Sequence, residues 1–361
     1  MVLGAASGLW SFPPLASAGS SAPSIVGIAK GADLRDVTRE ALALIGGISD
    51  VVRPGNRVFL KPNLAAVGNE PLPYNAVAWG VSTKPEIIAT VAEECLLAGA
   101  SQVVIGEAGQ SALINFGTKT VAGVEDAVGA VTLDGASDLG KEVERLNTRF
   151  GRKRVLLKSL NTETPYWGLF SSITNLRWLA VSSHVLEADV VISLPVLKTH
   201  HLTATTLSIK NFYGVTPISL YGSPRLKGHD ADLGIEQVII DLFKAIRPHL
   251  AVIDGSVGAE GEAPNVGPEE GRTVDVSQRL GGYLVLASTD LLAADATASR
   301  IIGMDPDAIR YIWMGAQQGL GQKDLGRIVL RGTPFREATM KWMPSLISGY
   351  PQKGPRLKET S

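Results

Sequence analysis

Short apolar runs alternate with amphipathic stretches along most of this chain, and that alternation predicts an α/β fold. The apolar runs predict strands at residues 24–29, 57–60, 102–105, 189–194, 250–253, 283–287 and 327–330. Helical periodicity predicts helices at residues 34–44, 83–99, 176–188, 203–212, 233–246, 290–302 and 306–318. We therefore expect a mostly parallel sheet flanked by helices. Inserted segments, such as residues 116–158, are expected to build a second, smaller lobe.

The two ends of the chain differ from this pattern, so we expect one main domain over residues 24–332. Residues 1–23 resemble the remnant of an export signal and a linker, because an apolar stretch precedes the A-x-A triplet at 16–18. The basic start of such a signal is missing, so a truncated signal and a periplasmic location are expected; the alternative is a cytoplasmic protein. Periodicity is lost after residue 333, which predicts a frayed tail over 333–361.

Composition and charge exclude several classes of function. The chain has 361 residues, is 45% hydrophobic and carries a net charge of -1, so it has no basic excess for binding nucleic acid. No apolar stretch is long enough to predict a transmembrane helix. Its single cysteine, Cys95, lies in a predicted helix, where we expect it to be buried. One thiol cannot by itself ligate an iron–sulfur cluster. The G-x-G-x-x-G, P-loop and G-x-S-x-G motifs are also missing from the sequence.

Polar residues follow the apolar strand at 189–194 without any intervening turn signal. Lys198, His200 and His201 come first, and Lys210 and Asn211 come shortly afterwards. In α/β proteins, ligands bind just beyond the carboxyl ends of the strands. The sequence therefore predicts a binding or active site here. The alternative for Lys210 and Asn211 is a solvated helix face.

A second polar group follows the strand at 57–60. Lys61 and Asn63 come directly after it, and together they suit a carboxylate or a phosphate. A long irregular loop at 65–82 adjoins them, and loops of this length are often binding loops. The alternative is a surface loop in which Lys61 pairs with an acid.

Strand geometry distinguishes the two histidines. Successive side chains of an extended chain point to opposite faces, so Lys198 and His200 should share a face that His201 does not. We therefore expect His200 to transfer a proton or to bind a metal. His201 is then expected to be structural, and the two rings are not expected to meet one ion.

Three carboxylates, Glu107, Asp254 and Glu260, lie at or after strand ends. Each could act as a base, pair with the lysines, or join His200 in holding a divalent metal. The metal candidates are His200, Asp254 and Glu260, although the sequence contains no established metal-ligand spacing. Asp295, in an alanine-rich helix, is expected either to orient a neighbouring segment or to have no special role.

These motifs, in this order, resemble the family called domain of unknown function 362 (DUF362). The matching pieces are Lys61-Pro62-Asn63, Ser82-Thr83-Lys84-Pro85-Glu86, Gly99-Ala100, Pro195-Val196-Leu197-Lys198-Thr199-His200, Lys210-Asn211 with Gly214, Asp254-Gly255 with Glu260-Gly261, and Asp290 with Asp295. The resemblance implies an α/β fold and no particular activity. Some relatives carry ferredoxin-like cysteines and are described as iron–sulfur proteins; this chain lacks them, so no intrinsic iron–sulfur cluster is expected.

The working hypothesis is an enzyme that acts on a small anionic molecule in a cleft between lobes. The expected binding residues are Lys61, Asn63, Lys210 and Asn211, and the expected catalytic residues are His200, Lys198, Glu107 and Asp254. A non-catalytic exported binding protein for an anion or a metal complex is the first alternative. An internal ion-pair network is the second.

Overall fold

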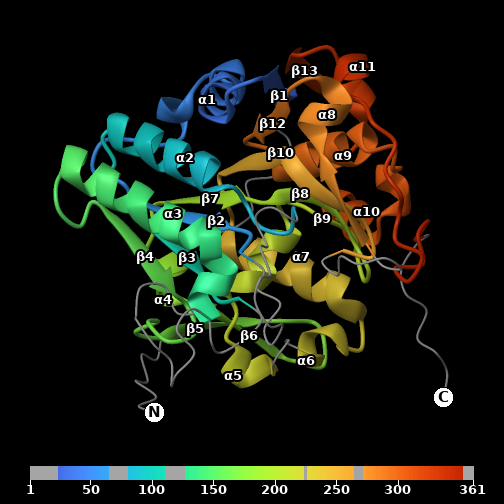
Figure 1. Ribbon diagram of the computed structural model, residues 1–361. Helices are drawn as coiled ribbons and strands as arrows, with labels where there is room; N and C mark the ends of the chain where they lie inside the picture. Colours follow the sequence, from blue (N-terminus) through green and yellow to red (C-terminus); the bar gives the residue numbers. More distant parts are fainter. Residues whose placement is uncertain (1–22, 65–79, 110–126, 223–225, 264–270, 353–361) are drawn as a thin grey trace.

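The computed structural model describes most of the chain (Figure 1). The described residues are 23–64, 80–109, 127–222, 226–263 and 271–352. The expected export signal and most of the loop at 65–82 lie outside them. Within the described part, no helix combines the length and the apolar character needed to cross a membrane.

A sheet of 11 strands forms the centre of the molecule. Its main path runs in the order β13 (Ile328–Gly332), β1 (Ser24–Gly31), β12 (Tyr283–Ser288), β10 (Leu250–Gly261), β7 (Val190–Leu194), β2 (Arg57–Pro62), β3 (Gln102–Glu107) and β4 (Val155–Ser159). Along this path, among the strands described, only β12 is antiparallel to its neighbours. The predicted mostly parallel sheet is confirmed.

Five further strands lie off this path. They are β8 (Val196–His200), β9 (Ala204–Thr206), β11 (Gly271–Asp275), β5 (Trp167–Ser171) and β6 (Trp178–Ser182). β8 runs parallel to β10, and β9 pairs with β8. β5 and β6 form a separate antiparallel pair outside the central sheet.

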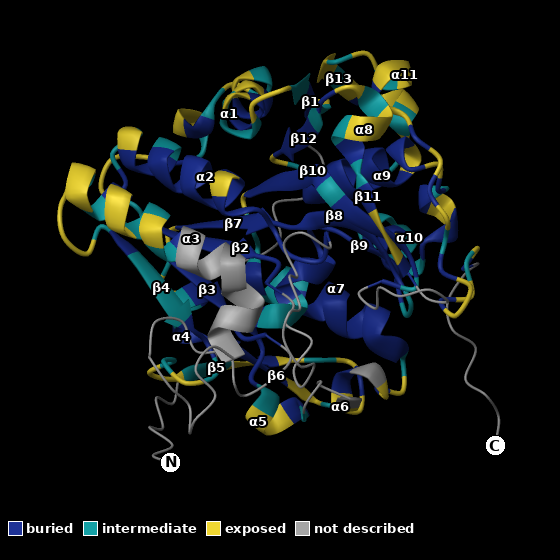
Figure 2. Cartoon of the chain, viewed as in Figure 1, coloured by how far each residue is buried: buried dark blue, intermediate teal, exposed yellow. Residues whose placement is uncertain are grey.

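Helices cover both faces of the sheet, whose strands are mostly buried (Figure 2). The helices are α1 (Leu34–Leu44), α2 (Pro85–Leu97), α3 (Ala127–Phe150), α4 (Ser183–Leu186), α5 (Ile218–Tyr221), α6 (Leu226–His229), α7 (Gly234–Ile246), α8 (Val276–Leu280), α9 (Leu291–Ile301), α10 (Arg310–Gln317) and α11 (Phe335–Ala338). Short 3₁₀ helices are η1 (Ile48–Asp50), η2 (Lys210–Val215), η3 (Pro306–Ala308) and η4 (Leu325–Arg327). One hydrophobic cluster contains residues of α1, α2 and α3, including the buried Cys95, and the other contains residues of α7, α9 and α10.

Two predicted helices are wrong. Residues 176–188 form β6 and the short α4, and residues 203–212 form β9 and the start of η2. In the second case, the amides of Ser208 and Ile209 donate to the carboxylate of Asp295 on α9. A distant buried carboxylate takes up backbone donors here, and local periodicity does not reveal such a partner.

Between the predicted strands at 250–253 and 283–287 the notable glycine- and proline-bearing stretch suggests a long loop at 256–282, but its described residues are mostly regular structure, because β10 continues to Gly261 and β11 and α8 follow. Gly258 permits a close approach rather than a turn. A Cβ on Gly258 would lie 2.1 Å from the carbonyl oxygen of Leu197 in β8, and one on Gly80 would lie 2.1 Å from the carbonyl oxygen of Gly258. Glycine at both positions therefore lets β8 and the segment before α2 pack against β10.

The segments assigned to inserts and tail are also part of the main body. β4, from the expected insert at 116–158, pairs with β3 in the central sheet. Residues 333–352, expected to be frayed, include α11 and bury Met340, Trp342 and Gln352. The backbone of Met343 bonds both to Gly261 and to the carboxylate of Glu260. This segment is therefore held against the end of β10, whereas residues 353–361 lie outside the description.

Docking of this segment is tested by Trp342→Ala. The Trp342 side chain is 3% exposed, so its removal should lower the free energy of unfolding by about 3–5 kcal/mol. Leu346 is 83% exposed, and Leu346→Ala should change that free energy by no more than about 0.5 kcal/mol. Denaturant unfolding measures both. Equally small effects of the two substitutions would contradict the docked segment.

Candidate functional site

The polar residues predicted from the sequence gather at the carboxyl ends of neighbouring strands. β2 lies between β3 and β7 in parallel pairing, so Lys61 and Glu107 end up at the same edge of the sheet. After Pro195 the chain leaves β7 and continues as β8 beside β10, which carries Lys198 past Asp254. The topology therefore brings segments from four parts of the sequence together.

Lys61 and Glu107 form a buried ion pair. The Lys61 Nζ donates to Glu107 Oε2 at 2.5 Å and to the carbonyl of Pro62 at 2.7 Å. Glu107 also accepts the amides of Ala108, at 2.9 Å, and of Gly109, at 3.0 Å. Both partners are buried. Lys61 therefore already has the acidic partner that the structural alternative predicted for it.

Asn211 and Gly214, both in η2, close over this pair. Asn211 Nδ2 donates to the carbonyl of Lys61 at 2.6 Å and to Ser193 Oγ at 3.1 Å. A Cβ on Gly214 would lie 2.3 Å from Glu107 Oε1 and 2.8 Å from Lys61 Nζ. Glycine is therefore required for η2 to lie directly against the pair.

Asp295 orients the start of η2, and this is one of the two roles expected for it from the sequence. Its carboxylate accepts the amide of Ser208 at 2.8 Å and the amide of Ile209 at 3.1 Å. Burial raises the pKa of Asp295 to about 7, and the hydrogen bonds from Ser208 act in the opposite direction. The side chain fixes the backbone just before Lys210 and Asn211.

Asp254 is the counter-ion of Lys84, a residue that the sequence interpretation missed. Asp254 Oδ2 accepts the Lys84 amide at 2.8 Å and lies 3.6 Å from its Nζ. Oδ1 accepts the amide of Ser256 at 3.0 Å. Burial lowers the pKa of Lys84, and the charge of Asp254 partly offsets that shift.

The sequence Thr83-Lys84-Pro85-Glu86 has the S/T-x-x-E pattern of a helix cap, which predicts that Thr83 caps α2. In the structure Thr83 does not cap this helix. Its Oγ1 donates instead to the carbonyl of Leu194 at 2.6 Å, and the cap position is taken by Lys84. The same short motif therefore joins α2 to the end of β7. The capping pattern hid the role of Lys84, which shows only once β10 is placed beside it.

Lys198 is buried with two hydrogen-bond acceptors and no carboxylate. Its Nζ donates to the carbonyl of Val81 at 2.8 Å and to Asn63 Oδ1 at 3.3 Å, and within the described part of the chain it has no ion pair. Burial lowers the pKa of Lys198 well below its ordinary value, and the charge of Lys210 lowers it further. An ammonium group has three donors, so one of them has no acceptor among the described residues.

Lys210 is 9% exposed. Its amine forms no hydrogen bond or ion pair with any residue that the structure describes, and burial alone lowers the pKa of this group to about 7. Lys61, Lys84, Lys198 and Lys210 are called the lysine cluster below. Two of its members have a carboxylate partner, Glu107 or Asp254.

The two histidines lie side by side, contrary to the prediction from strand alternation. Their rings stack with centroids 4.5 Å apart and an angle of 17° between the planes. β8 ends at His200, so the chain has already begun to turn at His201 and the two-residue period no longer applies. The amide of Leu202 donates to His200 Nδ1 at 3.0 Å. Burial lowers the pKa of His201, and the charges of Lys210 and Lys198 add to this effect.

The three candidate metal ligands do not form one site. Glu260 Oε1 accepts a hydrogen bond from Arg279 at 3.1 Å, and its Oε2 accepts the amide of Met343 at 2.8 Å. Among the residues with described positions, no three His, Cys, Asp or Glu side chains are grouped so that they could hold a metal ion. Glu260 instead connects β10 to the C-terminal segment.

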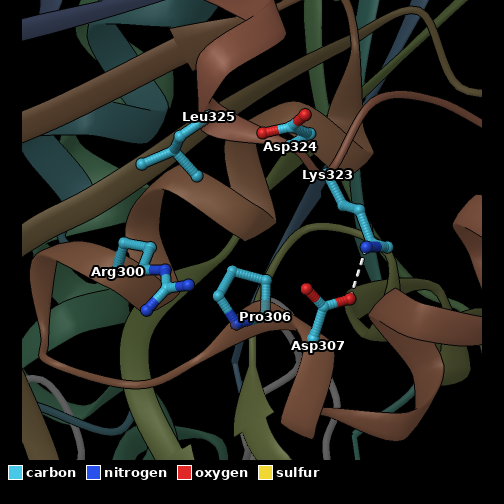
Figure 3. A pocket seen from close by; sticks show the side chains of 6 residues that line it. All are labelled: Arg300, Pro306, Asp307, Lys323, Asp324 and Leu325. Atoms are coloured by element: carbon cyan, nitrogen blue, oxygen red, sulfur yellow. Dashed lines mark hydrogen bonds and ion pairs between the residues drawn. The ribbon is translucent and has the colours of Figure 1, made fainter.

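A pocket of about 290 Å³ lies elsewhere, and Figure 3 shows its lining. The lining residues are Arg300, Pro306, Asp307, Lys323, Asp324 and Leu325. Lys323 is paired with Asp307, and Arg300 is paired with Asp305. Its cations are thus already neutralised within the chain, whereas the described residues supply no carboxylate partner for Lys198 or Lys210.

Comparison with known proteins places the chain in a family. Residues 58–300, more than half of the chain, match the family described as "Domain of unknown function (DUF362)". A thylakoid-associated protein of Synechocystis sp. is 31% identical over 284 residues, which cover 78% of this chain and 74% of that protein. The chain therefore belongs to the DUF362 family, as the motifs suggested.

Two solved structures are distantly similar. The lactate racemase apoprotein from Thermoanaerobacterium thermosaccharolyticum gives a TM-score of 0.32 at 12% identity, covering 64% of this chain and 50% of that one. A protein from Thermotoga maritima gives a TM-score of 0.36 at 11% identity, covering 68% and 55%. The chain thus spans about half the length of each, and likeness at this level supports no statement about function.

The tight fit of η2 over the ion pair is tested by Gly214→Ala. The added methyl group meets the Glu107 carboxylate, so the free energy of unfolding should fall by about 1–3 kcal/mol. Gly140, in α3, has nothing within 4 Å of an added Cβ, and Gly140→Ala should be neutral or stabilising by up to about 1 kcal/mol. Thermal and denaturant unfolding compare the two. An unchanged free energy of unfolding in Gly214→Ala would show that η2 does not lie against the pair.

The buried amine of Lys210 predicts a specific dependence of stability on pH. Between pH 7 and 10.5 the unfolded chain holds a proton on Lys210 that the folded chain lacks, so this residue's penalty shrinks as the pH rises. Lys210→Met removes the penalty and should stabilise the protein by a few kcal/mol (on the order of 3) at pH 6, and by less as the pH approaches 10. Lys153→Met, at an exposed lysine, should show no such trend. Destabilisation by Lys210→Met at pH 6 would indicate a carboxylate partner instead.

Proposed function

We propose that this DUF362 protein is an enzyme that acts on a small anion held by Lys198 and Lys210. The supporting observation is that both amines are buried and, within the described residues, neither has a carboxylate partner. Opposite charge within a few ångströms favours the ammonium form of a buried lysine. A bound anion supplies this charge, and its binding is thereby favoured.

The contrast inside the lysine cluster supports a ligand site over a purely structural network. Lys61 and Lys84 each have their own carboxylate, as a structural network requires. A buried charge without a partner costs several kcal/mol, a penalty that a folded protein retains mainly where the charge has a use. Lys198 and Lys210 retain that penalty next to two neutralised neighbours. A bound anion would supply the negative charge that these two lysines lack among the described residues.

The remaining predicted residues then take supporting roles. Asn63 accepts a hydrogen bond from Lys198, and Asn211 holds the backbone of Lys61, so both position the cluster. Glu107 and Asp254 neutralise Lys61 and Lys84. His200 is proposed to exchange a proton with the bound anion, because its ring is buried beside His201 at the end of β8.

The lowered pKa of Lys210 favours catalysis over simple capture of an anion. A protein that only captured anions would gain from cations that stay charged across the physiological range. Burial instead lowers the pKa of Lys210 to about 7, where an amine both gives and accepts protons readily. Groups with such shifted values are common at catalytic sites.

The anion site is tested by isothermal titration calorimetry with glycolate, oxalate and inorganic phosphate. Lys198→Met removes a charged hydrogen bond and should weaken the tightest of these ligands by about 10- to 100-fold, from a loss of roughly 1.5–3 kcal/mol. Lys153→Met should leave the affinity unchanged. Affinity should also fall as the pH rises above about 7, because Lys210 loses its proton.

The same titrations separate the competing functions. Equal affinity in wild type and Lys198→Met, or affinity that rises with pH, would contradict the anion site. His200→Gln should keep the affinity but abolish conversion of anions in a metabolite extract of the host, followed by mass spectrometry. Conversion that is undetectable even with the wild-type protein, combined with intact binding, would favour the non-catalytic binding protein.

A further inference from the structure

We propose that Lys210 is a nucleophile that forms an imine with the carbonyl group of a small 2-oxo carboxylate. This inference rests on the proposed anion site and names its substrate class. Lys198 would bind the carboxylate, and the carbonyl next to that carboxylate would then face Lys210. Printed contacts link the segments that carry the two lysines: Lys198 Nζ donates to Asn63 Oδ1 at 3.3 Å, and Lys61 Nζ donates at 3.4 Å to Oδ1 of Asn211, the residue after Lys210.

Lys210 differs from the other members of the lysine cluster in its hydrogen bonds. The amines of Lys61 and Lys84 donate to backbone carbonyls at 2.7 and 2.6 Å and also have carboxylate partners. Lys198 donates to two acceptors. Within the described part of the chain, the amine of Lys210 has no such bond, and the residue keeps 9% of its surface exposed. Its lone pair is thus the one best placed to attack a ligand.

The environment also makes this amine reactive near neutral pH. Only a neutral amine is a nucleophile, and burial lowers the pKa of Lys210 to about 7, so a large fraction is neutral there. Desolvation next to a second cationic group is an established way to activate a lysine for imine formation. For Lys210, burial alone has this effect.

The backbone that carries Lys210 is fixed on both sides. Asp295 holds the amides of Ser208 and Ile209 immediately before it. Asn211, immediately after it, bonds to Lys61 and Ser193. A reactive side chain on such a constrained segment approaches its target from one direction, which reduces the entropy lost in the reaction.

The bond changes balance without an oxidant or reductant. The amine nitrogen of Lys210 attacks the carbonyl carbon, and the carbon–oxygen π electrons move to the oxygen, which takes up a proton. The nitrogen then gives up a proton, and the hydroxyl group leaves as water with another proton while the carbon–nitrogen double bond forms. The net change is amine, carbonyl and one proton to protonated imine plus water. The protonated imine then withdraws electrons from the neighbouring C–H or C–C bond.

Reductive trapping with matched ligands tests this step. The full-length protein is incubated with glyoxylate and sodium cyanoborohydride, and the modified peptide is identified by tandem mass spectrometry. At glyoxylate concentrations that saturate the site, Lys210 should carry most of the adduct, and its yield should rise with pH near 7 as the amine loses its proton. Glycolate, equal in charge but without the carbonyl, should give no adduct and should protect Lys210 in competition.

Variants separate the imine from the anion site. Lys210→Arg should abolish the specific adduct, Lys198→Met should reduce it, and Lys153→Met should leave it unchanged. Labelling spread evenly over surface lysines, together with glycolate binding that depends on Lys198, would overturn the imine and leave the anion site intact. If the wild-type protein bound neither glycolate nor glyoxylate, both the imine and the anion site would be overturned.

Discussion

Burying four lysine amines at one edge of a sheet is the constraint on which this structure depends. Like charges in a medium of low polarity repel strongly, so the fold must supply negative charge at close range. Glu107 and Asp254 do so for Lys61 and Lys84. Because these pairs join β2 to β3 and α2 to β10, the electrostatic requirement and the architecture of the sheet are met by the same contacts.

The close packing around the pairs follows from that requirement. Glycine at 214 lets η2 lie against the Lys61–Glu107 pair, and glycine at 80 and 258 lets the segment before α2 and β8 approach β10. Excluding water in this way strengthens each ion pair and makes any unpartnered amine more reactive. Lys198 and Lys210 lie in these surroundings with lowered pKa values, which is why we assign the ligand and the chemistry to them.

Much of this arrangement could be predicted from the sequence, because strand ends are visible in apolar runs. The positions of Lys61, Glu107, Lys198 and Asp254 after strands were sufficient to expect a shared edge. What could not be predicted depends on contacts between distant segments. Lys84 looked like part of a helix cap until β10 was placed beside it. Residues 203–212 looked helical because the carboxylate of Asp295 that binds their amides lies on another helix.

The central claim is that Lys198 and Lys210 form a site completed by an external anion. A crystal structure of the protein soaked in sodium bromide, with data collected at the bromine absorption edge, tests it most directly. We expect an anomalous peak in contact with the Nζ atoms of both lysines, and loss of that peak in Lys198→Met. A carboxylate of the protein itself between the two amines, with no peak there, would contradict it.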